Sequence, residues 1–201
     1  MIEEILSILR IKQTEILFVF LYGSRLWGNA HPKSDFDLLV VVKDSKMKPL
    51  KSQHGRQFDI TVLDESDYQQ AINDGSFLEL ITLFVPNANV LYNGTKRYSF
   101  KLEYFANLEA FCIERVAKDR VLAGKMLVKN RQKSHKILIH GVRTIILSIR
   151  MVEFIQLQTP IEFQVDWDLV EMETDDIFLE FDKECQHHLQ ILKTKIQKLF
   201  R

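Results

Sequence analysis

Leu21-Tyr-Gly-Ser-Arg-Leu-Trp-Gly-Asn-Ala-His-Pro-Lys-Ser-Asp-Phe-Asp-Leu-Leu-Val-Val-Val42 joins two strand patterns through a turn and a pair of acids. The apolar run from Ile16 to Tyr22 predicts a buried strand, and the Gly23-Ser24 pair that follows it predicts a turn. A second apolar run, from Leu38 to Val42, is rich in β-branched residues and predicts a second strand. The chain therefore begins with a β-structure that carries polar side chains at its strand ends.

Acidic side chains stand at the start of the second predicted strand. Asp35 and Asp37 are two residues apart, so both project to the same side of a strand, and two adjacent carboxylates repel each other unless a cation lies between them. The alternating segment from Gln57 to Leu63 predicts a third strand, which would bring Asp59 to the pair. Three carboxylates offer the hard oxygen ligands that Mg²⁺ takes together with substrate phosphates.

This order of features resembles the nucleotidyltransferase superfamily typified by DNA polymerase β. The resemblance rests on residues 16–64, and its elements are Gly23-Ser24, Gly28, Asp35-Phe-Asp37 and Asp59. Within the superfamily, Tyr22-Gly-Ser-Arg25, Gly28 and Ser34-Asp-Phe-Asp37 are most similar to the predicted nucleotidyltransferases associated with RNA repair.

The resemblance implies transfer of a nucleoside monophosphate from an NTP to a hydroxyl or phosphate acceptor, with release of pyrophosphate. Asp35 and Asp37 would bind two ions of Mg²⁺, or of Mn²⁺, and Asp59 would bind the catalytic ion and take the acceptor's proton. Gly23 lets backbone amides approach a phosphate and Ser24 adds a hydroxyl, so this turn is expected to hold the β- and γ-phosphates. Arg25 is expected to reach a phosphate or to pair with a nearby acid.

Composition narrows the class of protein. The chain has 201 residues and is 46% hydrophobic, which is enough for one domain or two small ones. Lys plus Arg and Asp plus Glu both number 27, so no global field attracts nucleic acid. Cys112 and Cys185 lack ligand-like spacing, which argues against a zinc site or a disulfide framework. Without a signal-peptide pattern or a run of about 18 apolar residues, we expect a soluble, cytoplasmic protein with no membrane partner.

The predicted fold class is α+β. A small mixed β-sheet with flanking helices is expected over residues 1–95 as the nucleotidyltransferase domain, with a polar connection over residues 43–55. Glycine and proline become rare after residue 98, and helical periodicity predicts a C-terminal bundle over residues 96–201 as a substrate-binding domain. Its three helices are predicted over residues 98–128, 132–157 and 175–200, with a looser stretch at Thr159-Pro160.

Charge is unevenly distributed in the helical half. Lys and Arg dominate residues 115–143, where Asp119 is the acid, and Asp and Glu dominate residues 153–184. At about 100° per residue, six basic side chains would fall within about 40° of a common line, provided that the helical register holds across a modest break near Asn130; they are Lys118, Lys125, Lys129, Lys136, His140 and Arg143. Two interpretations remain open: a solvated face paired with the acidic segment, or a surface that binds triphosphate or a nucleic-acid backbone.

The similarity of the helical half to the RNA-repair group implies that Lys129, Lys136, His140 and Arg143 bind the nucleotide. The expected partners are an NTP, which donates the nucleotide, and RNA, which is the favoured acceptor. One alternative is a small-molecule or protein acceptor, since antibiotic-modifying and antitoxin nucleotidyltransferases share this core. Another is a module without catalysis that binds nucleotides or nucleic acid.

Overall fold

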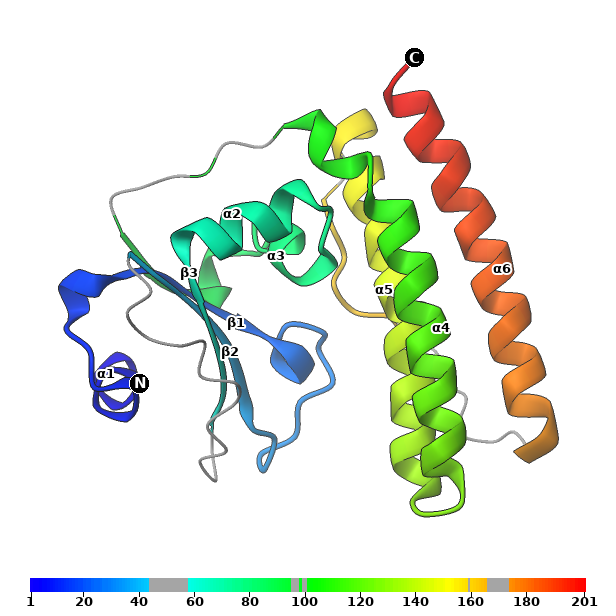
Figure 1. Cartoon of the computed structure of the whole chain (residues 1–201), viewed down its shortest axis with the longest axis horizontal. Coiled ribbons are helices and arrows are strands. Elements are labelled where there is room, and N and C mark those ends of the chain that lie inside the picture. Colours follow the sequence, from blue (N-terminus) through cyan, green and yellow to red (C-terminus); the bar gives the residue numbers. More distant parts are fainter. Residues whose placement is uncertain (44–57, 95–97, 99–100, 159, 166–173) are drawn as a thin grey trace. The chain divides into compact units, whose positions relative to one another are not determined.

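The computed structural model describes residues 1–43, 58–94, 98, 101–158, 160–165 and 174–201 (Figure 1). The chain divides into two compact units, one of Met1–Asn73 with Leu78–Phe100 and the other of Asp74–Phe77 with Lys101–Arg201. Most of the connection predicted over residues 43–55, residue 159 of the looser stretch and the predicted boundary at residues 95–96 lie outside the described residues.

The first unit is built on a four-stranded mixed sheet with the strand order β3-β2-β1-β4. Its strands are β1 (Ile16–Tyr22), β2 (Phe36–Val42), β3 (Phe58–Asp64) and β4 (Val90–Asn93). β1 pairs antiparallel with β2 and with β4, whereas β2 and β3 run parallel. This mixed pairing confirms the predicted sheet, and all three strands predicted around the acidic motif are present.

Helices cover the sheet on both faces. α1 (Ile2–Leu9) buries Ile5 and Leu9 in a cluster with Leu38 and Val40 of β2. On the opposite face, the ring of Tyr68 in α2 (Glu65–Asn73) stacks on Phe20 with 6.3 Å between centroids. Burial of apolar side chains on the two faces is the main stabilising contribution to this unit.

Short helical segments connect these elements. The segments are η1 (Gln13–Glu15), η2 (Gly23–Arg25), α3 (Phe77–Ile81) and η3 (Asn87–Asn89). At the junction of β3 and α2, the Asp64 carboxylate accepts hydrogen bonds from the Ser66 hydroxyl and from the Asp67 amide, at 2.6 and 2.8 Å. This contact satisfies an amide in the first turn of α2, so Asp64 has a structural role.

The second unit is a bundle of three long helices: α4 (Leu108–Leu127), α5 (Arg131–Leu157) and α6 (Thr174–Leu199) (Figure 1). The predicted bundle is confirmed, but its first helix begins at Leu108 and not near residue 98. The chain is extended at Lys101 and then forms the 3₁₀ turn η4 (Leu102–Phe105), from which Tyr104 and Phe105 are buried. These aromatic side chains reach the core from a turn, so they do not follow the helical period.

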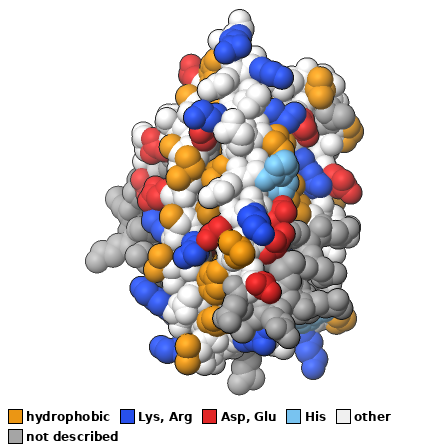
Figure 2. All heavy atoms as spheres, turned by 90° about the vertical axis from the view of Figure 1, so that its right-hand side faces the viewer, with side chains coloured by type: hydrophobic (Ala, Val, Ile, Leu, Met, Phe, Trp, Pro, Cys, Tyr) orange, Lys and Arg blue, Asp and Glu red, His pale blue; other side chains and the backbone are white. Residues whose placement is uncertain are grey.

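Ion pairs link the helices of the bundle. The Arg120 guanidinium on α4 binds both carboxylate oxygens of Asp182 on α6, at 2.7 and 2.8 Å. Lys195 on α6 lies 2.9 Å from Glu153 on α5. Basic and acidic side chains also alternate over the face seen in Figure 2. Part of the predicted basic and acidic segments therefore pair with each other.

Two further observations concern composition. Cys112 and Cys185 are buried free thiols. Within the described part of the chain, no helix combines the length and the apolar character that crossing a membrane requires.

Candidate active site

Asp37 and Asp59 lie side by side on the neighbouring strands β2 and β3 of the first unit. In the parallel pair β2–β3, Asp37 is the register partner of Asp59, and in the antiparallel pair β1–β2 it is the partner of Tyr22. Register partners on neighbouring strands project from the same face of a sheet. Asp37 and Asp59 therefore present adjacent carboxylates on one face, as the sequence predicts.

The turn after β1 packs directly against this acidic pair. Gly23 has a φ of +64°, a left-handed conformation that glycine adopts without strain. A β-carbon built on Gly23 would lie 1.7 Å from Oδ2 of Asp37. The Asp37 carboxylate thus occupies the space that any other side chain at position 23 would need, and the predicted Gly-Ser turn lies beside the predicted acids.

The loop between the turn and β2 is closed by Arg25. Its Nη2 donates a hydrogen bond of 2.8 Å to the Ser34 carbonyl oxygen, and its guanidinium lies 3.7 Å from the centre of the Phe36 ring. Arg25 thus contacts the backbone just before Asp35; the described contacts pair it with no acid. Trp27 of the same loop is 5% exposed and contributes to the core.

Tyr22 lies on the same face as the two aspartates. Its phenolic oxygen is 3.4 Å from Oγ1 of Thr61 on β3, so the side chain of a β1 residue reaches across the central strand β2. Burial raises the pKa of Tyr22 to about 12, and the negative charges of Asp37 and Asp59 add to the rise. Sequence reasoning assigned Tyr22 no role in the site. The feature that could have indicated one is its position at the end of the first strand, directly before the Gly23 turn.

Asp35 differs from the other two acids in its surroundings. It precedes β2 by one residue and is exposed, whereas Asp37 and Asp59 are half-buried. Among the described residues, no group of three His, Cys, Asp or Glu side chains is arranged to hold a metal ion. The donor chemistry nevertheless fits a divalent cation, because Asp37 and Asp59 offer adjacent hard oxygen ligands and their charge acts on the neighbouring phenol.

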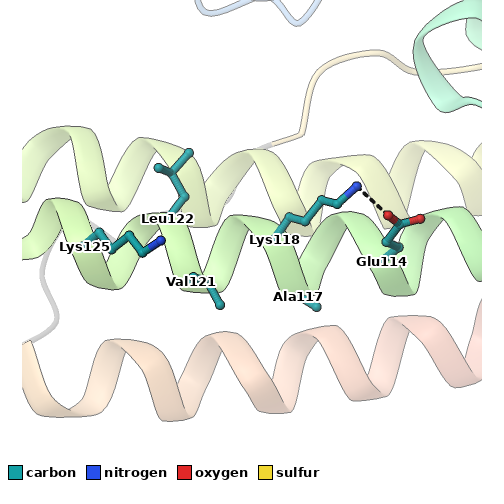
Figure 3. Close-up of a pocket in the computed structure, with 6 residues that line it drawn as sticks. All are labelled: Glu114, Ala117, Lys118, Val121, Leu122 and Lys125. Atoms are coloured by element: carbon teal, nitrogen blue, oxygen red, sulfur yellow. Dashed lines mark ion pairs between the residues drawn. The ribbon is translucent and has the colours of Figure 1, made fainter.

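The predicted basic stripe is not formed as one line, because the helical register does not hold across the break near Asn130. α4 ends at Leu127, and a new helix begins at Arg131 after Asn130, whose Oδ1 accepts a hydrogen bond of 2.9 Å from the Lys133 amide. This N-cap starts a separate helix, so Lys118 and Lys125 lie on α4 while Lys136, His140 and Arg143 lie on α5. Lys118 pairs with Glu114 of its own helix (Figure 3). The prediction of a common line was therefore wrong, because the helical register does not continue through the turn.

The α5 residues of the former stripe remain close together. Burial lowers the pKa of His140 to about 4, and the positive charges of Arg143, Arg115 and Lys136 lower it further. His140 is therefore a neutral imidazole near pH 7. Arg143 is 6% exposed, and burial also lowers its pKa. Lys129 lies in the turn between α4 and α5, where its amide bonds to the Met126 carbonyl oxygen.

Among the ion pairs of this unit that sequence reasoning did not identify is a buried one between Arg115 and Asp119. Arg115 donates from Nε to Oδ2 of Asp119 at 2.9 Å, and Asp119 is only 4% exposed. The available signal was the spacing of four residues between the two, which brings side chains together on a helix.

Comparison with known proteins finds a family model that matches most of the first unit. Residues 3–97 match the family model described as "Polymerase beta, Nucleotidyltransferase". The matched range contains the Gly23 turn, Asp35, Asp37 and Asp59. No curated protein sequence matches the chain.

Two solved structures resemble the whole chain distantly. Spectinomycin adenyltransferase AAD(9) from Enterococcus faecialis, in a structure with ATP and spectinomycin, is 12% identical with a TM-score of 0.43; the match covers 100% of this chain and 97% of that one. A nucleotidyltransferase-like protein from Exiguobacterium sibiricum 255-15 is 8% identical with a TM-score of 0.32, over 92% of this chain and 70% of that one. At these values the two structures add nothing to the match with the family model.

Proposed function

We propose, from the premise that residues 3–97 belong to the polymerase beta-type nucleotidyltransferases, that this protein transfers a nucleoside monophosphate from an NTP to an acceptor hydroxyl. The observation that carries the proposal is the row of Gly23, Asp37 and Asp59, in which a glycine turn packs against one of two adjacent carboxylates. Such a row supplies acidic ligands beside a backbone that a phosphate can approach.

Each residue of the row has a proposed task. Asp35, Asp37 and Asp59 would hold Mg²⁺ or Mn²⁺, which when bound would activate the attacking hydroxyl and neutralise the leaving pyrophosphate. The acceptor oxygen forms a bond to the α-phosphorus, the bond from that phosphorus to the β-phosphate oxygen breaks, and Asp59 takes the acceptor's proton. Gly23 and Ser24 would hold the β- and γ-phosphates, with Arg25 as a further phosphate contact.

The helical unit is proposed to bind substrate through Lys129, Lys136, His140 and Arg143. Support comes from the cations around His140, since Arg143 and Lys136 both act on its imidazole. A neutral His140 would donate or accept a hydrogen bond without adding charge. As acceptor we propose RNA, in a role in RNA repair in the cytoplasm.

A compact acceptor, a small molecule or a partner protein, is the second candidate. The observation that favours it is the pairing of cations on the bundle: Arg120 is engaged by Asp182 and Lys118 by Glu114. Paired cations contribute little to holding an extended phosphate backbone, because counterion release requires cations that the phosphates themselves neutralise.

The proposal is tested by incubating purified protein with Mg²⁺ and each labelled NTP. The reactions contain RNA, DNA, a small molecule, a partner protein or no acceptor. Labelled RNA alone supports the RNA acceptor, and labelling only of an added small molecule or protein supports the second candidate. If none of the combinations of acceptor and NTP gives labelled product while the protein still binds nucleotide, the protein is a binding module and the proposed transfer is wrong.

A further inference from the structure

A shallow apolar groove runs along the exposed side of α4. It has a volume of about 530 Å³, and two of its lining residues, Val121 and Leu122, are 57% and 48% exposed. All of the residues that line it belong to this one helix (Figure 3); they are Glu114, Ala117, Lys118, Val121, Leu122 and Lys125. Exposed apolar surface bordered by charged side chains is typical of a contact with another protein surface.

The lining positions of this groove are spaced symmetrically along the helix. Successive members are separated by three, one, three, one and three residues, so the order of spacings is the same in both chain directions. Their common midpoint lies between Asp119 and Arg120. The outermost members are Glu114 and Lys125, which carry opposite charges. The groove is therefore acidic at its N-terminal end and basic at its C-terminal end.

Such a surface is complementary to a second copy of itself. If two copies of α4 packed antiparallel about a two-fold axis at the midpoint, residues at equal distances on either side of the midpoint would face each other. Glu114 of each copy would then face Lys125 of the other, and this ion pair would form twice. Between these pairs, the small side chain of Ala117 would face the larger one of Leu122, which suits close packing of the two helices.

Charge selects this direction over the parallel one. Parallel copies would place each Lys125 beside the other and each Glu114 beside the other, and like charges repel. None of the described ion pairs includes Lys125, so its ammonium is open to a partner within the part of the chain that the structure describes. Glu114 already pairs with Lys118 of its own helix, but that pair is exposed, and a carboxylate has acceptor sites for a second ammonium.

We propose that the groove on α4 is the contact between two copies of this chain, packed antiparallel with Glu114 of each copy bound to Lys125 of the other. The contact over residues 114–125 would be about 17 Å long. Because this is short for a stable interface, we expect a weak dimer with a Kd on the order of tens of micromolar. The dimer goes beyond nucleotidyl transfer, since no residue with a task in the proposed reaction lies on α4.

Sedimentation velocity of the full chain, from about 1 μM to about 1 mM, tests for the dimer. The average mass should rise with concentration from that of one chain toward that of two, because an isologous contact closes after two copies. A wild-type protein that stays monomeric over this range overturns the proposal. Growth past two copies overturns it as well, since that behaviour requires a contact between two different surfaces.

Reversing one charge at a time tests the antiparallel pairing. Lys125→Glu and Glu114→Lys should each be monomeric at concentrations where the wild type is dimeric, because each variant sets like charges against each other. An equimolar mixture of the two variants should form a dimer, since every facing pair is then opposite in sign. A mixture that stays monomeric overturns the pairing. Lys193→Glu, at an exposed lysine of α6, changes the net charge equally and should leave the Kd within about twofold.

A variant that keeps every charge tests the apolar part of the contact. Leu122→Ser should raise the Kd of the dimer roughly tenfold, because it removes apolar surface that the second copy would cover. The matched control is Leu179→Ser, at a leucine of α6 that is 55% exposed and lies outside the groove, with an expected change below about twofold. Equal changes in both variants would place the contact elsewhere and overturn the proposal. Circular dichroism verifies that each variant retains its helical content.

Discussion

Gly23 and Asp37 share one space: the carboxylate of Asp37 lies where a side chain on Gly23 would begin, with Oδ2 only 1.7 Å from the position of the missing β-carbon. Gly23 directly follows β1 and Asp37 lies on β2, and these strands are register neighbours through Tyr22 and Asp37. The glycine turn and the acidic row therefore form one packed arrangement, and a change in either displaces the other.

Gly23→Ala is expected to abolish most activity. The methyl group cannot coexist with the Asp37 carboxylate, and a left-handed alanine adds a strain of about 1 kcal/mol. If Asp37 has its proposed catalytic role, displacement of its carboxylate by about 1 Å is expected to lower kcat roughly 100-fold. Steady-state transfer assays and thermal unfolding measure the two effects.

Gly124→Ala is the matched control. Gly124 lies inside α4, and apart from its chain neighbours and the adjacent backbone of its own helix, no atom of the described residues lies within 4 Å of the place that an added methyl group would take. Alanine is therefore expected to stabilise the helix by about 1 kcal/mol without affecting transfer. Equal activity of both variants would contradict the role given to the Gly23 turn.

Asp37→Asn and Asp59→Asn are each expected to lower kcat at least roughly 100-fold, because each removes a negative ligand from the proposed ion site. Chelation of divalent ions by EDTA should reduce wild-type activity to the same residual level, and Mg²⁺ should restore it.

Asp64→Asn supplies the control at the other end of β3. Asp64 caps α2 through its carboxylate oxygen, and an asparagine retains such an acceptor, so activity should stay within about twofold. A comparable loss of activity in Asp64→Asn and Asp59→Asn would show that removal of any negative charge from this strand lowers activity. That result would contradict a specific role of Asp59.

His140 gives the helical unit a dependence on pH. Its pKa is about 4 in the folded state against 6.5 ordinarily, so between these values the unfolded chain binds more protons than the folded one. The free energy of unfolding should therefore fall as the pH is lowered from about 6.5 to about 4, by at most about 3 kcal/mol. Urea unfolding at a series of pH values measures this slope.

The difference between the wild type and His140→Gln isolates the histidine. The raised pKa of Asp119 acts in the opposite direction, but it does so in both proteins and is therefore absent from the difference. Parallel pH profiles for the two proteins would show that His140 is not held neutral by the fold.

Asn130→Ala is expected to destabilise the α4–α5 hairpin by about 1 kcal/mol, because the Lys133 amide loses its acceptor at the start of α5. For a chain of this size that corresponds to a decrease in Tm of roughly 2–4 °C. Asn130→Asp keeps the acceptor and places a negative charge at a helix N-terminus, so its Tm should equal or exceed that of the wild type.

The sheet was predictable because its signals are local. The run from Ile16 to Tyr22 and the run from Leu38 to Val42 are apolar enough to be buried strands in any fold, and Gly23 marks the turn between them. The alternation around Asp59 fixes which side of β3 faces the other acids once β3 pairs with β2. The adjacency of Asp37 and Asp59 therefore follows from pattern and register alone.

The helical unit was less predictable because its decisive contacts are not local. A wheel drawn through Asn130 assumes one helix, and the cap that separates α5 from α4 depends on a single side-chain oxygen. The proximity of Arg115 to His140 depends on how α4 packs on α5, which periodicity does not encode. The start of α4 at Leu108 depends on burial of Tyr104 and Phe105 from a turn.

The division of the chain has a practical consequence for building chimaeras. Asp74–Phe77 belong to the same compact unit as Lys101–Arg201, and a β-carbon on Gly75 would lie 2.9 Å from the Leu108 backbone nitrogen. A recombinant that exchanges the bundle for that of a relative therefore needs two crossover segments, with the tetrapeptide transplanted alongside its helices. A single splice after residue 100 would leave the original Gly75 turn in place. The start of the foreign helix would then pack against a turn whose shape it does not match.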